Sequence, residues 1–379
     1  MLIPIVLAAA LMNAAMIAAS AMSTILIADK LSSGVAGLPN TAGVLGTAAG
    51  ALAVGRWTAR HGRAQALRTG YGFGVVGGAL MVLTAVGAHV GLLFVGMFLL
   101  GAGNAASLLS RYAAADAVPA ARRASAMSTV VWASTAGAVG GPFLMAPSQS
   151  FATALGLPAS AGPFLLALAT VFGALVASTY IRGARATDEP LPKLPARTGG
   201  SARTSLVLAA GVMIVGHLVM VALMSSVPVH THQHGQGLAL LGIMLSAHTL
   251  GMFALAPLTG WWIDRSGARP VTIAGLALLL MSAVLVTQTG LVFTPALFLL
   301  GYAWNLCYLG GSAQLVSADE ESKVESSIWA VSALATATSP WLFTLGGFPL
   351  LATASAVLTI PLLVLVLRRT PDRHRAASA

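Results

Sequence analysis

The sequence predicts an all-α integral membrane protein, and three features of its composition lead to that fold class. Of its 379 residues, 57% are hydrophobic and 8% are charged, whereas an average soluble protein carries about 25% charged residues. The mean hydropathy of +0.86 comes from long uncharged runs, as in chains that cross a bilayer repeatedly. The 41 glycines favour the close helix–helix contacts typical of membrane bundles.

A transmembrane helix needs roughly 20 mostly apolar residues, and charged or Pro/Gly-rich turns divide the chain into twelve such segments. The first six are expected near residues 3–28, 37–56, 70–88, 90–110, 126–146 and 161–181. The second six are expected near residues 205–227, 238–259, 270–290, 293–315, 326–345 and 347–367. The first segment resembles a signal peptide near Ala19 to Ala21. It lacks a basic start and is too long, so we interpret it as a spanning helix.

Lysines and arginines gather in every second connection between the predicted spans. Nineteen of the 20 fall in these connections or in the C-terminal tail, and Lys30 alone lies on the other side. Because cytoplasmic loops carry the excess of Lys and Arg, we expect a multi-pass protein of the cell membrane (plasma or inner membrane) with both termini cytoplasmic. The Lys and Arg residues that set this orientation account for the net charge of +10. No nucleic-acid partner is therefore expected.

One long polar segment, residues 183–204, has the Pro, Gly and Ser content of a flexible linker. It divides the chain into an N-terminal six-helix bundle, 1–182, and a C-terminal six-helix bundle with a short tail, 205–379. The stretch "GRWTARHGR" from Gly55 matches "GWWIDRSGA" from Gly260 at a constant offset of 205. Internal repeats of this kind are typical of secondary transporters, whose substrate binds between the halves.

The repeated motif also carries a family resemblance. Twelve spans, a central linker and the pattern G-x-x-x-D-R-x-G in "GWWIDRSG" resemble the major facilitator superfamily over essentially the whole chain. The stretches "AHTLGMFALAPLTG" and "GYAWNLCYLGGS" further resemble a bacterial branch of uncertain substrate. The resemblance implies two pseudo-symmetric bundles that move a small solute by alternating access.

In that family, the Asp and Arg of the motif tie cytoplasmic helix ends together while the protein is open outward. The first copy here has Ala59 in place of the Asp. We hypothesise that acids of the loop "SADEESKVES" pair with Arg56, Arg60 or Arg63 instead; the alternative is a solvated charge run. The predicted conformational-switch residues are Gly55, Arg60, Gly62, Arg63, Gly260, Asp264, Arg265, Gly267 and Glu325.

The means of coupling stays open at this level. Met97 stands where many proton-coupled members of the family have an arginine, and no Asp or Glu is expected deep in a span. Proton transfer through histidine, another ion, or facilitated diffusion are the alternatives. His217 and His248 are each expected about 15 Å deep by helical rise, and histidine titrates near neutral pH. The coupling candidates are therefore His217, His248 and Asp29, which lies at the end of span one.

Span five contains Gly137, Gly141 and Pro142 in the G-x-x-x-G-P arrangement that the resemblance associates with antiporters. Gly–Pro is expected to bend this helix. The later glycines of the pattern are replaced by Met145 and Ala146, so the match is partial. It favours efflux of a drug or metabolite; the alternative is uptake or facilitated diffusion of a small metabolite.

Spans one, four, seven and ten line the central cavity in this architecture. For their polar members, ligand contact and hydrogen bonding between helices are the two alternatives. Aromatic walls with few polar groups suit a small organic substrate. The predicted cavity residues are Asn13, Asn104, Ser107, His217, Trp304, Asn305 and Tyr308.

Three histidines alternate in "VPVHTHQHGQG", which is expected to form the outer turn between spans seven and eight. His230, His232 and His234 would share one side of an extended loop, where neutral imidazoles can bind zinc. The alternatives are a pH- or metal-responsive outer segment and no specific metal binding.

Sequence motifs of catalysis are missing, since no Walker loop, HExxH or nucleophile elbow occurs. The single cysteine, Cys307, excludes an internal disulfide. We therefore expect a monomeric non-enzyme without a cofactor. Its partners would be a small-molecule substrate, the lipid bilayer and protons as a candidate coupling ion.

Overall fold

A computed structural model describes residues 2–31, 37–181, 200–233, 238–288 and 290–368. Within these ranges the chain is helical and contains no strand. The first group of helices is α1 (Leu2–Lys30), α2 (Leu38–His61), α3 (Arg63–Ala85), α4 (Gly91–Asp116), α5 (Arg123–Ala154) and α6 (Ala161–Thr179). The second group is α7 (Gly200–Gln233), α8 (Leu238–Phe253), α9 (Ala256–Ser266), α10 (Ala268–Leu285), α11 (Phe293–Ser312) and α12 (Ala318–Arg368). Two short 3₁₀ helices, Ala120–Arg122 and Gly290–Val292, precede α5 and α11.

These helices correspond to the twelve predicted spans. The helices α8 and α9 form one interrupted span, because Pro257 in the first turn of α9 has no N–H to continue the ladder. The long α12 holds two spans that turn at Gly346 and Gly347. Gly347 has φ +60°, a left-handed conformation that glycine adopts without strain. This turn falls where the sequence predicted the break between spans eleven and twelve.

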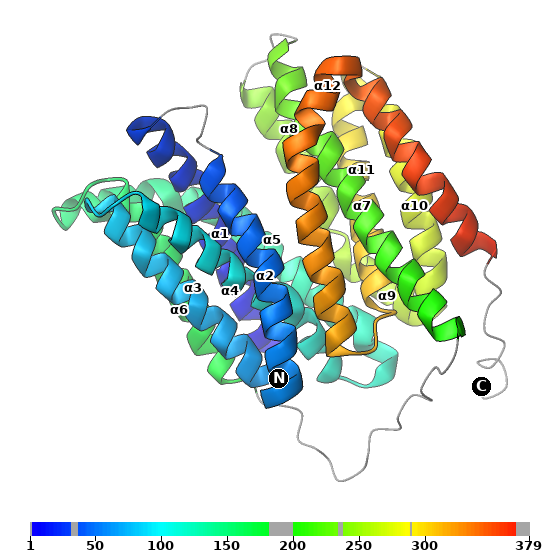
Figure 1. The fold of residues 1–379 in the computed structure, drawn as a ribbon, viewed down its shortest axis with the longest axis horizontal. Coiled ribbons are helices and arrows are strands. Elements are labelled where there is room, and N and C mark those ends of the chain that lie inside the picture. The colour runs from blue at the N-terminus through cyan, green and yellow to red at the C-terminus, as the bar shows by residue number, and fades with distance from the viewer. Residues whose placement is uncertain (1, 32–36, 182–199, 234–237, 289, 369–379) are drawn as a thin grey trace.

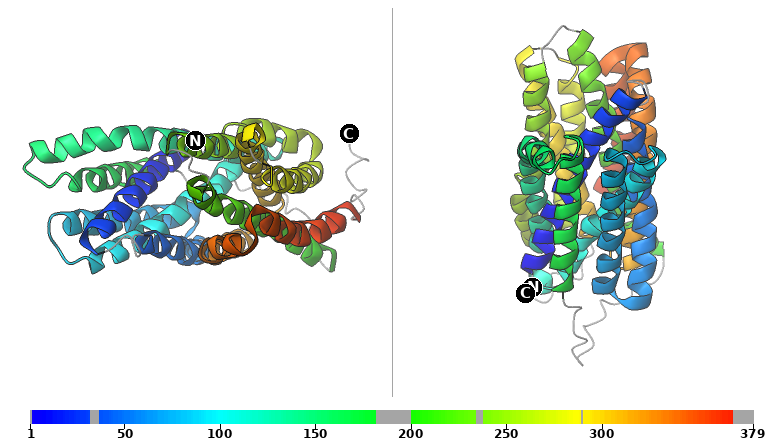
Figure 2. Two further views of the ribbon diagram at one scale, coloured as in Figure 1. Left: turned by 90° about the horizontal axis from the view of Figure 1, so that it is seen from above. Right: turned by 90° about the vertical axis from the view of Figure 1, so that its left-hand side faces the viewer.

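The two groups of helices lie side by side (Figures 1 and 2). They meet where α2 runs beside the first part of α12 and where α5 packs against α9. In the described ranges, α1 and α7 share no extensive contact. In Figure 1 the two groups lie close together at the end that holds α9 and the start of α12, and they diverge toward the opposite end. We call the end that holds the α2–α3, α4–α5, α9–α10 and α11–α12 turns the basic end, because the arginine-rich connections lie there.

The turns at the basic end repeat in the two groups. A single glycine joins α2 to α3 and α9 to α10: Gly62 with φ +83° and Gly267 with φ +82°. Both backbone conformations favour glycine, which explains why the motif has glycine at these positions. In each group an arginine also donates hydrogen bonds to backbone carbonyls near the end of the last helix. Arg68 donates to Ser178 O and Thr179 O at the end of α6, and Arg269 donates to Val366 O and Leu367 O near the end of α12.

The first glycine of each motif copy lies where the two groups touch. A Cβ on Gly55 would overlap the Ser322 side chain of α12, and a Cβ on Gly260 would overlap the Ser128 side chain of α5. Any larger residue at these positions must push the two groups apart at the basic end. The first glycine of each motif copy is therefore required by the close approach between the two groups.

The expectation of an outer turn from Val227 is wrong. Helix α7 begins at Gly200 and continues to Gln233, so its first residues overlap the end of the predicted linker. His230 and His232 thus lie within this helix and not in an extended loop. His234 lies outside the described residues.

The contact at Gly260 yields a first prediction. Replacing Gly260 with valine should separate the groups at the basic end, because the added side chain overlaps Ser128. Spin labels on cysteines at Gln65 of α3 and Ser266 of α9, both exposed, should then report a longer distance. Gly72→Val is the matched control, since open space surrounds Gly72. An unchanged distance in the Gly260 variant would show that this contact does not hold the groups together.

Candidate functional site

A buried ion pair joins the two groups of helices. Arg111 on α4 places Nη2 2.7 Å from Glu325 Oε2 on α12. Both side chains are 1% exposed, and Arg111 heads the largest fully buried side chains among the described residues. Charges almost never lie fully buried unless paired, so each of these residues requires the other.

Neutral groups surround the pair and complete its hydrogen bonds. Glu325 Oε1 accepts from Tyr308 OH at 3.2 Å and from Trp329 Nε1 at 3.1 Å. The Arg111 guanidinium donates to Ser312 Oγ and Tyr112 OH. It also lies between the Tyr112 and Tyr308 rings, 4.3 and 4.4 Å from their centroids, where cation–π attraction adds to the ion pair. We call Arg111, Tyr112, Tyr308, Ser312 and Glu325 the ionic layer.

The ionic layer gives Glu325 a buried partner that the sequence did not predict. The sequence placed Glu325 just before span eleven and Arg111 just after span four, as loop residues. Instead α12 begins at Ala318 and α4 continues to Asp116, so both residues lie within helices that face each other. A charged residue near a span end does not reveal its partner in sequence, and the pairing appears only when the two groups meet.

Aromatic side chains lie next to the ionic layer, toward the opposite end of the molecule. Trp304 stacks on Tyr308 with centroids 4.7 Å apart and an interplanar angle of 16°. Its Nε1 donates to His217 Nδ1 on α7 at 2.9 Å. The His217 ring also lies 5.5 Å from Trp329, and Phe253 contacts Trp304 edge-on at 6.0 Å. We call His217, Phe253, Trp304 and Trp329 the aromatic layer.

Asn104 and Ser107 lie on α4, the helix that carries Arg111 and Tyr112 of the ionic layer. They precede Arg111 by seven and four residues, which puts all three on one face of the helix. Ser107 is buried, whereas Asn104 is half-buried. No hydrogen bond of the Asn104 side chain occurs within the described ranges, so its amide is available to a ligand. Of the predicted cavity residues, the structure thus brings together His217, Trp304 and Tyr308 and places Asn104 and Ser107 on the face of α4 that carries Arg111.

The other predicted cavity amides bond to helix backbone. Asn305 is fully buried; it donates to Met252 O at 2.7 Å and accepts from Thr259 Oγ1 at 2.8 Å. It thereby spans the interruption between α8 and α9. Asn13 donates to Ser134 O of α5 at 2.6 Å. These contacts favour the helix–helix alternative for Asn305, and for the amide nitrogen of Asn13.

His217 and His248 lie at different distances from the α7–α8 connection by helical rise. His217 lies sixteen residues before the end of α7, about 24 Å, while His248 lies ten residues after the start of α8, about 15 Å. The distance differs from the expected one for His217 because α7 continues six residues beyond Val227. His248 Nδ1 instead contacts Leu297 O at 3.0 Å, within its own group. Asp29 is exposed in the last turn of α1, away from both layers.

The motif acid Asp264 ties the groups together at the basic end. Its carboxylate accepts from the backbone N–H of Ala124 and Ser125 at 3.0 and 2.9 Å, and from Ser125 Oγ. These donors lie at the start of α5, where the helix dipole favours a negative charge. The role that the family resemblance implied for Asp264 is consistent with this geometry. Arg265 lies 5.7 Å from the Trp261 ring of its own helix.

The first copy of the motif, which has Ala59, uses different chemistry. Glu321 of α12 lies 2.7 Å from Arg63, and Arg63 also contacts Asp116 at 3.0 Å. Asp116 in turn contacts Arg123 at 3.1 Å. Burial raises the pKa of the Glu321 carboxyl, while Arg63 opposes this shift. The hypothesised pairing across the groups therefore forms at Arg63; Arg56 and Arg60 are exposed.

The remaining predicted residues lie away from the two layers. A Cβ on Gly137 would overlap Ala10 O, and Gly141 lies beside Ala14, so this part of the span-five motif packs α5 on α1. The α5 backbone stays helical through Pro142. His230 is buried against Phe293, Phe343 and Phe348, with centroids 5.0 to 6.2 Å away. No cluster of metal-ligating side chains occurs among the described residues.

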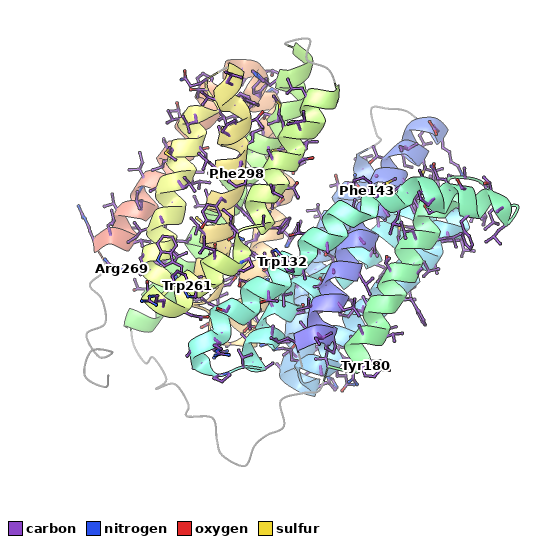
Figure 3. The ribbon with its side chains drawn as sticks, turned by 180° about the vertical axis from the view of Figure 1, so that it is seen from behind. Trp132, Phe143, Tyr180, Trp261, Arg269 and Phe298 are labelled. Carbon is purple, nitrogen blue, oxygen red and sulfur yellow. The ribbon has the colours of Figure 1, made fainter. Side chains whose placement is uncertain are left out.

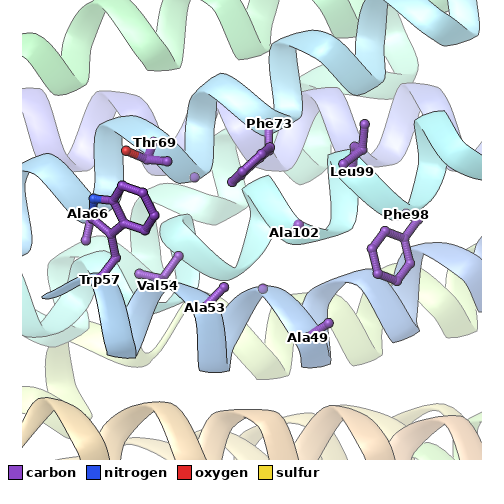
Figure 4. Close-up of a pocket in the computed structure, with 12 residues that line it drawn as sticks. Ala49, Ala53, Val54, Trp57, Ala66, Thr69, Phe73, Phe98, Leu99 and Ala102 are labelled. Atoms are coloured by element: carbon purple, nitrogen blue, oxygen red, sulfur yellow. The ribbon is translucent and has the colours of Figure 1, made fainter. Parts of the chain in front are cut away.

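Two hollows lie outside these layers. An apolar groove of about 180 Å³ runs between α2, α3 and α4 and is lined by Trp57, Phe73 and Phe98 (Figure 4). A second hollow of about 360 Å³ lies beside His230 and the Gly347 turn. Trp132, half-exposed, lies on the side of α5 that faces the other group (Figure 3). The ionic and aromatic layers, which draw on both groups, form the candidate functional site.

A membrane-spanning helical fold with two groups that meet around a polar centre defines a transporter-like protein. The family model "Major Facilitator Superfamily" matches residues 5–323. The chain belongs to the major facilitator superfamily, which confirms the resemblance seen in the sequence.

Relatives and solved structures agree with this assignment. The uncharacterized MFS-type transporter YddS of Bacillus subtilis is 31% identical over 374 residues, covering 90% of this chain and 85% of that protein. The riboflavin transporter RfnT of Brucella anthropi is 31% identical over 309 residues, covering 76% and 74%. Among solved structures, the proton:xylose symporter XylE has a TM-score of 0.70 at 15% identity, covering 98% and 96%. The Escherichia coli fucose:proton symporter FucP has a TM-score of 0.70 at 16% identity, covering 97% and 99%. The chain is thus a membrane transport protein of this fold.

The buried ion pair yields a second prediction. Arg111→Gln or Glu325→Gln alone should lower the free energy of unfolding by about 3–5 kcal/mol, because each leaves an uncompensated buried charge. The double variant should lose less than the sum of the two. Chemical unfolding in mixed micelles measures the three values. Lys323→Gln is the control, because the Lys323–Asp319 pair is exposed and such a pair contributes about 0.5 kcal/mol. Additive losses would contradict a direct coupling between Arg111 and Glu325.

Proposed function

We propose that this protein is a proton-coupled secondary transporter that moves a small organic solute across the cell membrane by alternating access. The observation that carries the proposal is the Arg111–Glu325 ion pair, which joins the two groups of helices next to the aromatic layer. The moving units would be the bundles 1–182 and 205–379, with 183–204 as linker. Both termini and the basic end would face the cytoplasm, by the excess of Lys and Arg there.

The ion pair supplies a physical means of coupling. While Glu325 is ionised, it holds Arg111 and so keeps the basic end closed. Protonation removes the negative charge, and a buried arginine without a counter-ion destabilises the closed arrangement. A proton thus shifts the population toward a state open at the basic end, by as much as its binding differs between the two states.

The aromatic layer favours a small organic substrate. Flat aromatic walls with a few polar groups are typical of sites for such ligands. Trp329 and Phe253 are the half-buried members of this layer, and Asn104 of α4 is half-buried as well. We propose efflux by antiport with protons, on the partial G-x-x-x-G-P pattern of α5. A second candidate is transport of a flavin, since one relative is named a riboflavin transporter.

Proteoliposomes test the coupling. With an imposed pH gradient, the wild-type protein should accumulate its substrate, screened from riboflavin and a panel of aromatic drugs and metabolites. Glu325→Gln should lose gradient-driven accumulation and keep exchange of labelled for unlabelled substrate, because it lacks the carboxyl that would take up and release the proton while exchange needs no net proton movement. The spin-label pair at Gln65 and Ser266 should also report an open basic end in this variant.

Asp319→Asn is the matched control for charge. Asp319 lies six residues before Glu325 on α12, is 68% exposed and, among the described residues, forms its ion pair with Lys323. Its removal should leave accumulation unchanged. Gradient-driven accumulation by the Glu325 variant at the wild-type rate would refute coupling through this carboxyl.

A further inference from the structure

The two ring nitrogens of His217 have different roles that the structure fixes. Trp304 Nε1 lies 2.9 Å from His217 Nδ1. An indole N–H can only donate, so Nδ1 must be the acceptor. In a neutral imidazole the proton then lies on Nε2. Trp304 is therefore a positioning residue: it selects the tautomer of His217.

The donor on the other side of the ring has no partner among the described residues. His217 is 6% exposed, and no hydrogen bond of its Nε2 occurs among the described residues. His217 Nε2 is not among the described polar atoms that are both fully buried and unpaired, so it keeps surface that a ligand can reach, whereas the rest of the site is well paired. Glu325 accepts from Arg111, Tyr308 and Trp329, and Arg111 is occupied by Glu325, Ser312 and Tyr112. The unused polar groups near the aromatic layer are thus one donor, His217 Nε2–H, and the Asn104 amide.

The charges of the site favour an uncharged ligand. Arg111 and Glu325 neutralise each other at 2.7 Å, so neither offers a free charge to an anion or a cation. A protonated His217 would have to give up the hydrogen bond from Trp304. The half-buried members of the aromatic layer are Trp329 and Phe253, and Trp329 lies 5.5 Å from the His217 ring. An indole face beside a single N–H donor suits a flat ring that bears a hydrogen-bond acceptor.

We propose that His217 Nε2–H recognises a carbonyl or ring-nitrogen acceptor on a neutral, flat solute that lies against Trp329. His217 is then the residue that determines specificity, and Trp304 keeps its donor turned toward the solute. The proposal rests on the proposed function, since it names the substrate class of that transporter.

The tautomer is tested without any ligand. Nitrogen NMR of the full-length protein labelled with ¹⁵N-histidine, with His217→Gln used for assignment, should show a protonated Nε2 and an unprotonated Nδ1. Trp304→Phe should populate the other tautomer, because it removes the donor to Nδ1. A proton on Nδ1 in the wild-type protein would overturn the proposal.

Specificity is tested with two probes that differ by one acceptor. Radiolabelled 9-fluorenone and fluorene are both flat, neutral three-ring compounds, and only the first has a carbonyl. Binding to protein in nanodiscs, after subtraction of empty nanodiscs, should be about fivefold tighter for fluorenone, the value of one hydrogen bond. His217→Gln, whose side-chain amide still donates, should keep the preference, and His217→Phe should bind both probes equally.

His89→Phe provides the matched control. His89 Nδ1 also accepts an N–H, from Gly91, but this histidine lies at an exposed turn, so the variant should keep the preference. Absence of binding, equal affinities in the wild-type protein, or a preference retained in His217→Phe would each overturn the inference. If any one of these results is found while gradient-driven transport is intact, the inference about His217 fails and the proposed transport function stands. Loss of gradient dependence alone would refute only that function.

Discussion

The ion pair between Arg111 and Glu325 is the interaction on which the rest of the site depends. It crosses between the two groups of helices with both charges 1% exposed, so the groups cannot separate there without exposing or neutralising a charge. Tyr308 and Trp329 are held by Glu325, and Trp304 stacks on Tyr308. Trp304 in turn donates a hydrogen bond to His217 and so fixes the position of that ring. One electrostatic contact therefore positions side chains of four helices.

The two groups are joined by unlike contacts although their sequences repeat. In the second motif copy, Asp264 caps the start of α5. In the first copy Ala59 cannot cap α12, and that helix start is completed locally: Ser317 Oγ accepts from Glu320 N, and Glu320 accepts from Val316 N, as in a capping box. The link between the groups passes instead to Glu321 and Arg63. A capping interaction on one side is thus matched by an ion pair on the other.

The sequence predicted span positions better than it predicted contacts. Hydrophobic length gave twelve spans, and Gly62, Gly267 and Gly347 mark real turns because their φ values are positive. The depth of His217 was misjudged, since polar residues from His230 onward were interpreted as a loop although α7 continues to Gln233. Glu325 was placed at a span end, which is correct along the chain. That position said nothing about its partner, which is 214 residues away in sequence.

The sequence by itself determined the fold class, the family and the repeat of the loop motif. These depend on hydrophobic period, charge distribution and local turns, which neighbouring residues specify. Only the tertiary structure decided which polar residues form the site. The Arg111–Glu325 pair, the Trp304–His217 hydrogen bond and the occupied amide of Asn305 each join helices far apart in the chain. Their geometry depends on how whole helices pack, and packing is set by all contacts together rather than by the residues adjacent in sequence.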